Sequence, residues 1–205
     1  MKNLIQYFIA LNIAVLASGC ASPTSRFYTL SIEAKAEGPP ARHCSVSVGP
    51  VQVPAEVDHA PITLQVSPNC LEENEFNRWA EPLDENIARV VAGNLAAQLG
   101  TTQVVAGPAA NFKPDYQVTL HIQHFKSVLG RVAEVEALWV VWPVAGGRPE
   151  SGHTLATEPV SGKTYEDLVA AHSRALVKVS SAIAAEIEHF DQLAHGLNPA
   201  PIHDD

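Results

Sequence analysis

The chain has 205 residues and a formal net charge of −9, with 22 acidic against 13 basic residues. This length suits one domain with one core and argues against a second large domain. The acidic balance argues against nucleic acid as a partner, because nucleic-acid binding selects for basic patches.

The first residues have the layout of a removable secretory signal. Lys2 supplies a positive start, and residues 4–17 form an apolar run that small residues follow. The run is too short to be a good membrane span. We therefore expect residues 1–19 to be a signal peptide.

The signal ends in a pattern that resembles a bacterial lipobox, Leu16-Ala17-Ser18-Gly19-Cys20. Lipoboxes usually place leucine three residues before the cysteine, where this chain has Ala17; the alternative is an ordinary signal with a chance cysteine. We expect Cys20 to carry acyl chains such as palmitate, which hold a soluble domain on a bilayer, and residues 20–26 to be a lipidated tether. Ala21, in place of an aspartate after the cysteine, favours the outer membrane in enteric-type sorting.

Three strands are expected before the first helix. Alternation of apolar and polar residues predicts strands over 26–32, 44–53 and 62–66, with a Gly-Pro break near residue 40. If the second and third strands pair as an antiparallel excursion, Cys44 and Cys70 meet. Once Cys20 is assigned to lipid, these two form an even pair in an oxidising compartment, and we expect a disulfide between them.

A helix is predicted between Pro82 and Gly100. Proline fits a first helical position, and glycine is the usual left-handed cap. The helix has one apolar face, formed by Leu83, Ile87, Val90, Val91, Leu95 and Leu99. Just ahead of it, Arg78 and Trp79 are candidates for contact with a partner; the alternative for Trp79 is a hydrophobic staple beneath the helix.

Two further strands show the clearest alternation in the chain, after a short apolar segment at Val104-Val105. Residues 115–125 alternate between one apolar and one polar face, and residues 131–144 follow as a second strand. One face of the second strand begins with Glu134 and Glu136 and continues with Leu138, Val140 and Trp142. These three apolar residues need cover, from the chain's own helix or from a neighbouring subunit or partner.

A last strand near 153–157 precedes a long helix. Thr164 and Asp167 predict a capping-box start, and an apolar stripe extends to Phe190. Together these elements predict an α/β fold, bordering on α+β, with two long amphipathic helices packed on a mixed sheet. We expect a single domain over 27–194, with a frayed tail from Asp191 that is disordered over 195–205.

Candidate catalytic and metal-binding residues do not form a convincing site. His121 and His124 are three apart on a strand and so are expected on opposite faces, where they cannot clamp a metal. The side chain of His172 points away from that of Ser173, which excludes a nucleophile and base pair. Paired Glu134 and Glu136 are read as solvated surface. We expect no enzyme activity, no metal and no cofactor.

Several motifs also carry a resemblance that spans nearly the whole mature chain, in order. They are Phe27-Tyr28-Thr29-Leu30, Val48-Gly49-Pro50-Val51 with Pro54, Arg78-Trp79-Ala80-Glu81-Pro82-Leu83, Asn94-Leu95-Ala96 to Leu99-Gly100, and Ala171-His172-Ser173 to Ile183-Ala184. In these the chain resembles the ABC-type transport auxiliary lipoproteins, which include the lipoprotein of the paraquat-inducible operon. Residues 55–61 depart from the family pattern, and Cys44 and Cys70 are not family hallmarks.

The resemblance implies a fold similar to the TolB amino-terminal domain. It also implies an outer-membrane lipoprotein, on the periplasmic face, that docks on a mammalian-cell-entry (MCE) type protein of an ABC-type phospholipid transport system. We expect Arg78, Trp79, Leu138, Val140 and Trp142 to contact that partner or a second copy of the chain in a homo-oligomer. The alternatives are a periplasmic lipid carrier with its own apolar pocket and a structural envelope lipoprotein.

Overall fold

The structure is a computed structural model that describes residues 24–36 and 44–196. Four strands precede the first helix within this part of the chain: β1 (Arg26–Tyr28), β2 (Val46–Gln52), β3 (Pro61–Ser67) and β4 (Cys70–Trp79). The remaining elements are α2 (Leu83–Leu99), β5 (Val104–Ala106), β6 (Tyr116–Val128), β7 (Val132–Pro143), β8 (Glu150–Pro159) and α3 (Tyr165–Gly196).

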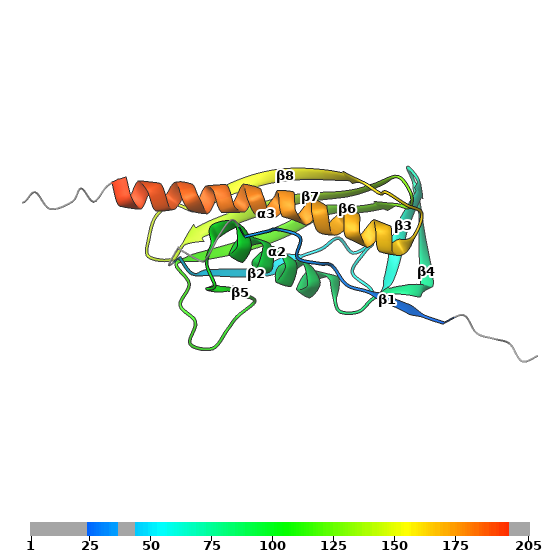
Figure 1. The fold of residues 1–205 in the computed structure, drawn as a ribbon, viewed down its shortest axis with the longest axis horizontal. Coiled ribbons are helices and arrows are strands. Elements are labelled where there is room, and N and C mark those ends of the chain that lie inside the picture. Colours follow the sequence, from blue (N-terminus) through cyan, green and yellow to red (C-terminus); the bar gives the residue numbers. More distant parts are fainter. Residues whose placement is uncertain (1–23, 37–43, 197–205) are drawn as a thin grey trace, which may run out of the picture.

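The strands form two sheets (Figure 1). The larger has the order β5-β2-β6-β7-β8, with β2 parallel to both β5 and β6 and with β6, β7 and β8 antiparallel. The smaller has the order β1-β4-β3 and lies across one end of the larger sheet. The predicted class, an α/β fold with two helices on mixed sheets, is confirmed.

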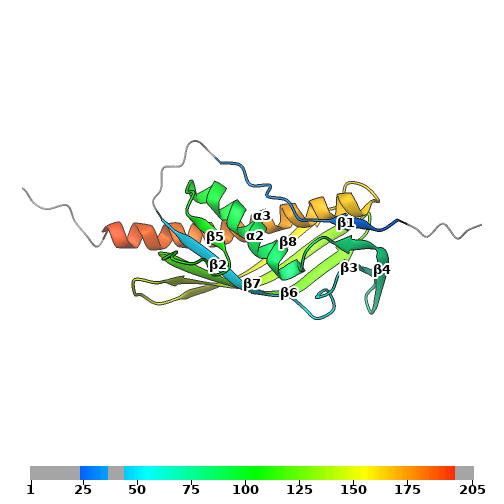
Figure 2. The same cartoon turned by 90° about the horizontal axis from the view of Figure 1, so that it is seen from below.

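Both helices pack on one face of the larger sheet (Figures 1 and 2). The face of β7 that they cover is almost fully buried, and consists of Ala133, Val135, Ala137, Trp139 and Val141. Trp139 packs so closely over Gly152 of β8 that a Cβ atom there would overlap the indole ring. The opposite face of the five-stranded sheet has no helix on it within the described residues.

Both predicted ends of α2 and the predicted start of α3 are confirmed. Pro82 immediately precedes α2, and Gly100 ends it in the left-handed region with φ 60°. At the start of α3 the Asp167 N–H donates to Thr164 Oγ1 over 3.1 Å, while the Thr164 N–H donates to Asp167 Oδ2 over 3.1 Å. This reciprocal pair is the capping box that the sequence predicts. The helix continues to Gly196, so the expected fraying from Asp191 is wrong for residues 191–196.

The expected pairing of β2 with β3 is wrong. β2 lies between β5 and β6, whereas β3 pairs with β4, a strand that the alternation did not reveal. The start of β2 and the β3–β4 hairpin lie at opposite ends of the fold (Figure 1). The predicted Cys44–Cys70 disulfide is accordingly not formed: Cys44 is buried just before β2, and Cys70 is exposed at the hairpin turn.

The expected orientation of the two histidines on β6 is also wrong. The register of β6 against β7 shifts between Ile122 and His124, so an extra residue enters the strand there. Because of this bulge, His124 is exposed on the same outer side as His121, while Phe125 is buried.

Candidate functional site

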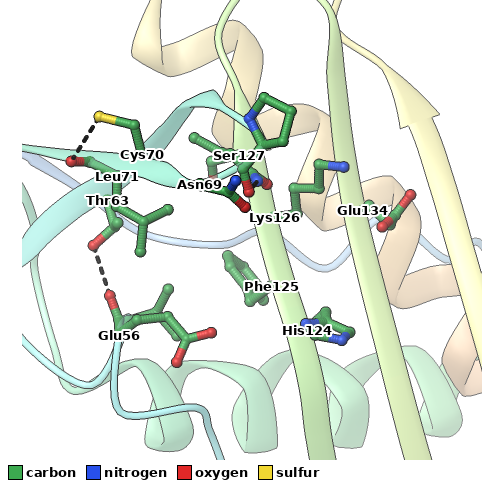
Figure 3. A pocket seen from close by; sticks show the side chains of 13 residues that line it. Glu56, Thr63, Asn69, Cys70, Leu71, His124, Phe125, Lys126, Ser127 and Glu134 are labelled. Atoms are coloured by element: carbon green, nitrogen blue, oxygen red, sulfur yellow. Dashed lines mark hydrogen bonds between the residues drawn. The ribbon is translucent and has the colours of Figure 1, made fainter.

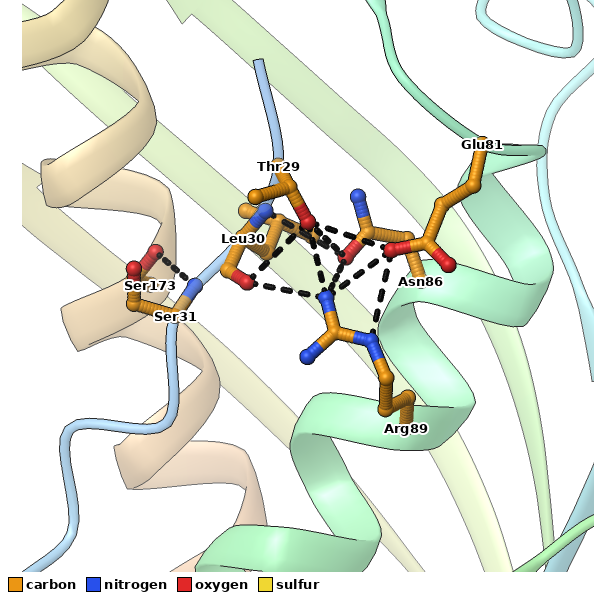
Figure 4. A network of polar contacts seen from close by, with 7 residues as sticks. All are labelled: Thr29, Leu30, Ser31, Glu81, Asn86, Arg89 and Ser173. Carbon is orange, nitrogen blue, oxygen red and sulfur yellow. Dashed lines mark hydrogen bonds and ion pairs between the residues drawn. The ribbon is translucent and has the colours of Figure 1, made fainter.

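The segment after β1 runs between the two helices and is held by their polar side chains (Figure 4). We call residues 29–34 the strap. The buried Asn86 accepts a hydrogen bond from the Leu30 N–H over 3.2 Å, and Ser173 accepts one from the Ser31 N–H over 3.0 Å. Sequence alternation predicted a strand here, but the strap's backbone donors bind side chains of α2 and α3 instead.

Arg89 fixes the start of the strap. Its guanidinium donates to the Leu30 carbonyl over 3.0 Å and to Thr29 Oγ1 over 2.8 Å, and it forms an ion pair with Glu81 at 2.9 Å. Asn86 accepts a further hydrogen bond from Arg89, over 2.7 Å. Arg89 therefore ties the start of the strap to α2.

Asn94 holds the other end of the strap. Its Oδ1 accepts hydrogen bonds from the N–H groups of Glu33 and Ala34, over 3.2 and 3.1 Å. Sequence reasoning missed this role, although two asparagines eight residues apart lie only about 80° apart around a helix, within the width of one face. A polar pair within an apolar stripe is the signal that was available.

Asn94→Ala is expected to lower the free energy of unfolding by about 1–3 kcal/mol, because two strap N–H groups lose their acceptor. Hydrogen exchange should become faster in residues 29–36 and stay unchanged in β6 and β7. Gln98→Ala is the matched control, since Gln98 on the same helix bonds Ser181 of α3 and leaves the strap alone. Unchanged exchange at Glu33 and Ala34 in Asn94→Ala would contradict this role.

The open face of the five-stranded sheet carries exposed apolar side chains. Leu138 is 39 % exposed and Trp142 55 %, with Val140 half-buried between them, and Leu155 on β8 is 56 % exposed. We call Leu138, Val140, Trp142 and Leu155 the apolar strip. The sequence left open whether the chain's own helix covers this face; α2 and α3 both lie on the other side.

Polar groups border the strip. Across the β6–β7 and β7–β8 pairs its residues face Gln117, Thr119, His121, Ser151 and His153. Glu136, on the same face, accepts a hydrogen bond from His153 over 2.7 Å and lies 3.7 Å from His124. An apolar patch with a polar rim is the usual anatomy of a protein contact surface.

A groove of about 520 Å³ lies between the β3–β4 hairpin and β6 (Figure 3). Charged side chains of both signs line it, among them Glu56, Lys126 and Glu134, and Lys126 sits directly opposite Glu134 across the β6–β7 pair. A carrier for acyl chains needs an apolar cavity between helices and sheet. This groove is lined by polar and apolar groups in about equal measure, and it lies on the hairpin side, not between the helices and the sheet.

His172 lies beneath the groove in the core. Its Nε2 is hydrogen-bonded to Ser127 Oγ at 2.8 Å, and its ring stacks on Phe125 at a centroid distance of 3.9 Å. Burial lowers its pKa from an ordinary value of 6.5 to about 3. The sequence analysis considered Ser173 as the partner of His172. The Ser173 hydroxyl instead accepts a hydrogen bond from the Ser31 N–H of the strap. Ser127 is 2 % exposed, and His172 Nδ1 has no hydrogen-bond partner among the described residues, so no carboxylate orients the ring as in a catalytic triad.

The two candidates ahead of α2 have different environments. Trp79 is only 6 % exposed and packs edge-on against Phe125. Its predicted role as a partner contact is wrong, and it is a core residue. Arg78 is on the surface and forms an ion pair with Glu75 at 3.3 Å. Cys20, the predicted site of acylation, lies outside the described residues.

Two absences hold for the described part of the chain. Within residues 24–36 and 44–196, no three His, Cys, Asp or Glu side chains are arranged to hold a metal ion. Neither α2 nor α3 is long and apolar enough to cross a membrane.

Solved structures show the same fold. A crystal structure of an uncharacterised protein superposes with a TM-score of 0.67 at 19 % identity, covering 80 % of this chain and 99 % of the other. A Xanthomonas campestris protein described under family DUF330 gives a TM-score of 0.67 at 16 % identity, covering 84 % and 99 %. At these identities the likeness shows the fold alone.

Among curated proteins no relative matches this chain. The family model for the ABC-type transport auxiliary lipoprotein component matches residues 28–184, from the end of β1 to well inside α3. This span includes the strap, α2, the apolar strip and every strand except the first two residues of β1. The chain belongs to the family of ABC-type transport auxiliary lipoprotein components.

Proposed function

We propose that this protein is a non-enzymatic docking component of an MCE-type system that moves phospholipid or other hydrophobic molecules between membranes. Acyl chains on Cys20 hold it at the periplasmic face of the outer membrane, and it docks on the periplasmic MCE-type protein. Family membership supports a role in ABC-type transport, and the resemblance in sequence supports the MCE partner. The apolar strip on the open sheet face is the observation that carries the docking role.

The arrangement of the fold suits an anchored docking module. The chain enters at β1, in the three-stranded sheet, whereas β7 ends and β8 begins at the opposite end of the molecule (Figure 1). α3 has 32 residues and is therefore about 48 Å long. Trp142 is the penultimate residue of β7. It thus lies far from the tether and faces the periplasm.

A second copy of the chain is the other occupant that the strip accepts. Its residues carry no charge, and the formal charge of the mature chain, −10 once Lys2 is removed with the signal, disfavours close approach of two copies except through such a neutral patch. Self-association on this face is part of the proposal.

The test is affinity purification of the tagged full-length protein from gently solubilised envelopes. An MCE-type protein should copurify with the wild type, and about ten-fold less of it with Leu138→Ser/Trp142→Ser, since exposed aromatic anchors dominate such contacts. Leu193→Ser is the matched control, because Leu193 is a 49 % exposed leucine on α3, outside the strip. Size measurement of each purified variant reports self-association.

One result would overturn docking. If no MCE-type protein copurifies and crosslinking in intact cells also finds none, the protein is an envelope-bracing lipoprotein instead. Copurification of phospholipid with the monomeric protein would favour the carrier role.

A further inference from the structure

The end of the molecule nearest the tether also exposes aromatic side chains. Phe27 on β1 is 65 % exposed, more than any other large apolar residue that the structure describes, and Phe76 on β4 is 41 % exposed. In the parallel pairing of the two strands Phe27 lies opposite Arg78, and Phe76 precedes Arg78 by two positions. Phe27 and Arg78 therefore share one side of the small sheet, and Phe76 is exposed close to them, where the register of β4 against β3 shifts. We call Phe27, Phe76 and Arg78 the end face.

The position of the end face is fixed by its neighbours. Tyr28 donates from its hydroxyl to Asn77 Oδ1 over 2.9 Å, and its carbonyl accepts the Ala80 N–H over 2.8 Å. The strap that follows is bound to both helices. Phe27 is thus held outward by the backbone on both sides of it and cannot fold back into the core without breaking these contacts.

We propose that the end face rests on the lipid bilayer to which the chain is anchored, with Phe27 and Phe76 at the boundary between headgroups and acyl chains. This inference depends on the proposed acylation of Cys20. Only residues 21–25 separate Cys20 from Arg26, and an extended chain over that interval reaches at most about 20 Å. The end face therefore stays within a short distance of the headgroups.

The charges around the end face decide which kind of lipid it fits. Arg78 is already paired with Glu75, and the exposed Glu72 and Glu73 of β4 outnumber the exposed Arg26 of β1. A surface with this balance gains little from anionic lipids. The contact is carried by the two phenylalanines, so it fits a zwitterionic phospholipid surface and is insensitive to salt.

Fluorescence quenching by spin-labelled lipid tests the contact in the acylated full-length chain. In a Cys70→Ser background, Phe76→Cys is labelled with an environment-sensitive dye, and the protein is reconstituted into phosphatidylethanolamine–phosphatidylcholine vesicles that contain acyl-chain nitroxides. Val144→Cys is the matched control, since Val144 is 54 % exposed just after β7, at the far end. Quenching at position 76 is expected to exceed that at position 144 by at least about two-fold, with the same result in high salt.

A second variant separates apolar contact from mere closeness to the tether. Phe27→Ser is expected to reduce quenching of the label at position 76 while circular dichroism stays unchanged, because Phe27 is exposed. If quenching is unchanged in Phe27→Ser, or equal at positions 76 and 144, the proposed contact is wrong. If the dye is instead shielded from water in detergent solution, and the shielding increases with protein concentration, a second copy covers the end face and the proposal also fails.

Flotation of the vesicles distinguishes failure of the anchor from failure of the end face. The wild type should float with the vesicles, whereas Cys20→Ala should not. A wild type that does not float overturns acylation of Cys20 and the end-face contact with it. A wild type that floats without the contrast in quenching overturns the end-face contact alone.

Discussion

Trp79→Ala is expected to lower the free energy of unfolding by about 3–5 kcal/mol, the usual cost of truncating a buried aromatic side chain. The indole is 6 % exposed and its ring centroid lies 6.1 Å from that of Phe125, at an interplanar angle of 77°. Its removal would leave a cavity where β4 meets β6, just before the start of α2. Urea unfolding of the purified protein measures the loss.

Trp142→Ala is the matched control for this change. It removes the same side chain from a site that is 55 % exposed, and it is expected to change stability by less than about 0.5 kcal/mol. The pair of variants therefore separates a core role from a contact role in one comparison. Equal loss of stability in the two variants would contradict the environments assigned to both residues.

Local sequence patterns were sufficient for the regular parts of the fold. The alternation of β7, and of β6 as far as Ile122, predicted which side chains point inward, because successive side chains of a strand face opposite sides. Both ends of α2 and the start of α3 were predicted from Pro82, Gly100 and Thr164, where the chemistry of the cap is carried by the residue itself.

Long-range pairing was not visible in the same way. β4 was missed because its sequence, Cys70–Trp79, is rich in exposed acidic residues and does not alternate; it is a strand because β1 and β3 supply backbone partners. The prediction of a strand over the strap was wrong for the converse reason. It alternates like a strand, but its N–H groups are bound by Asn86, Asn94 and Ser173, which lie more than fifty residues away.

The candidate contact residues were predicted in part. Leu138, Val140 and Trp142 were placed on the outer face of their strand because alternation fixes the side. Whether a helix covers that face depends on which side of the sheet both helices take, and the pattern of one strand does not contain this information. Burial of Trp79 depends in the same way on Phe125, forty-six residues later.

Acidification from pH 7 to pH 4 is expected to destabilise the fold by about 3 kcal/mol through His172 alone. Burial lowers the pKa of this imidazole from 6.5 to about 3. In the unfolded chain it binds a proton below pH 6.5, while the folded protein keeps it neutral until about pH 3. Since the unfolded state binds more protons in that window, the stability contributed by neutral His172 is complete above pH 6.5 and is lost as the pH falls toward 3.

The measurement compares urea unfolding of the wild type and of Ser127→Ala/His172→Phe at several pH values between 7 and 4. The double variant removes both partners of the buried 2.8 Å hydrogen bond and keeps an aromatic ring against Phe125, so neither group is left buried without its partner. Exposed carboxylates titrate equally in both proteins, and their contribution cancels in the difference. The gap in stability should therefore shift in favour of the variant by about 3 kcal/mol on acidification. Parallel pH profiles would show that His172 accepts a proton in the folded state, which its burial beneath the groove forbids.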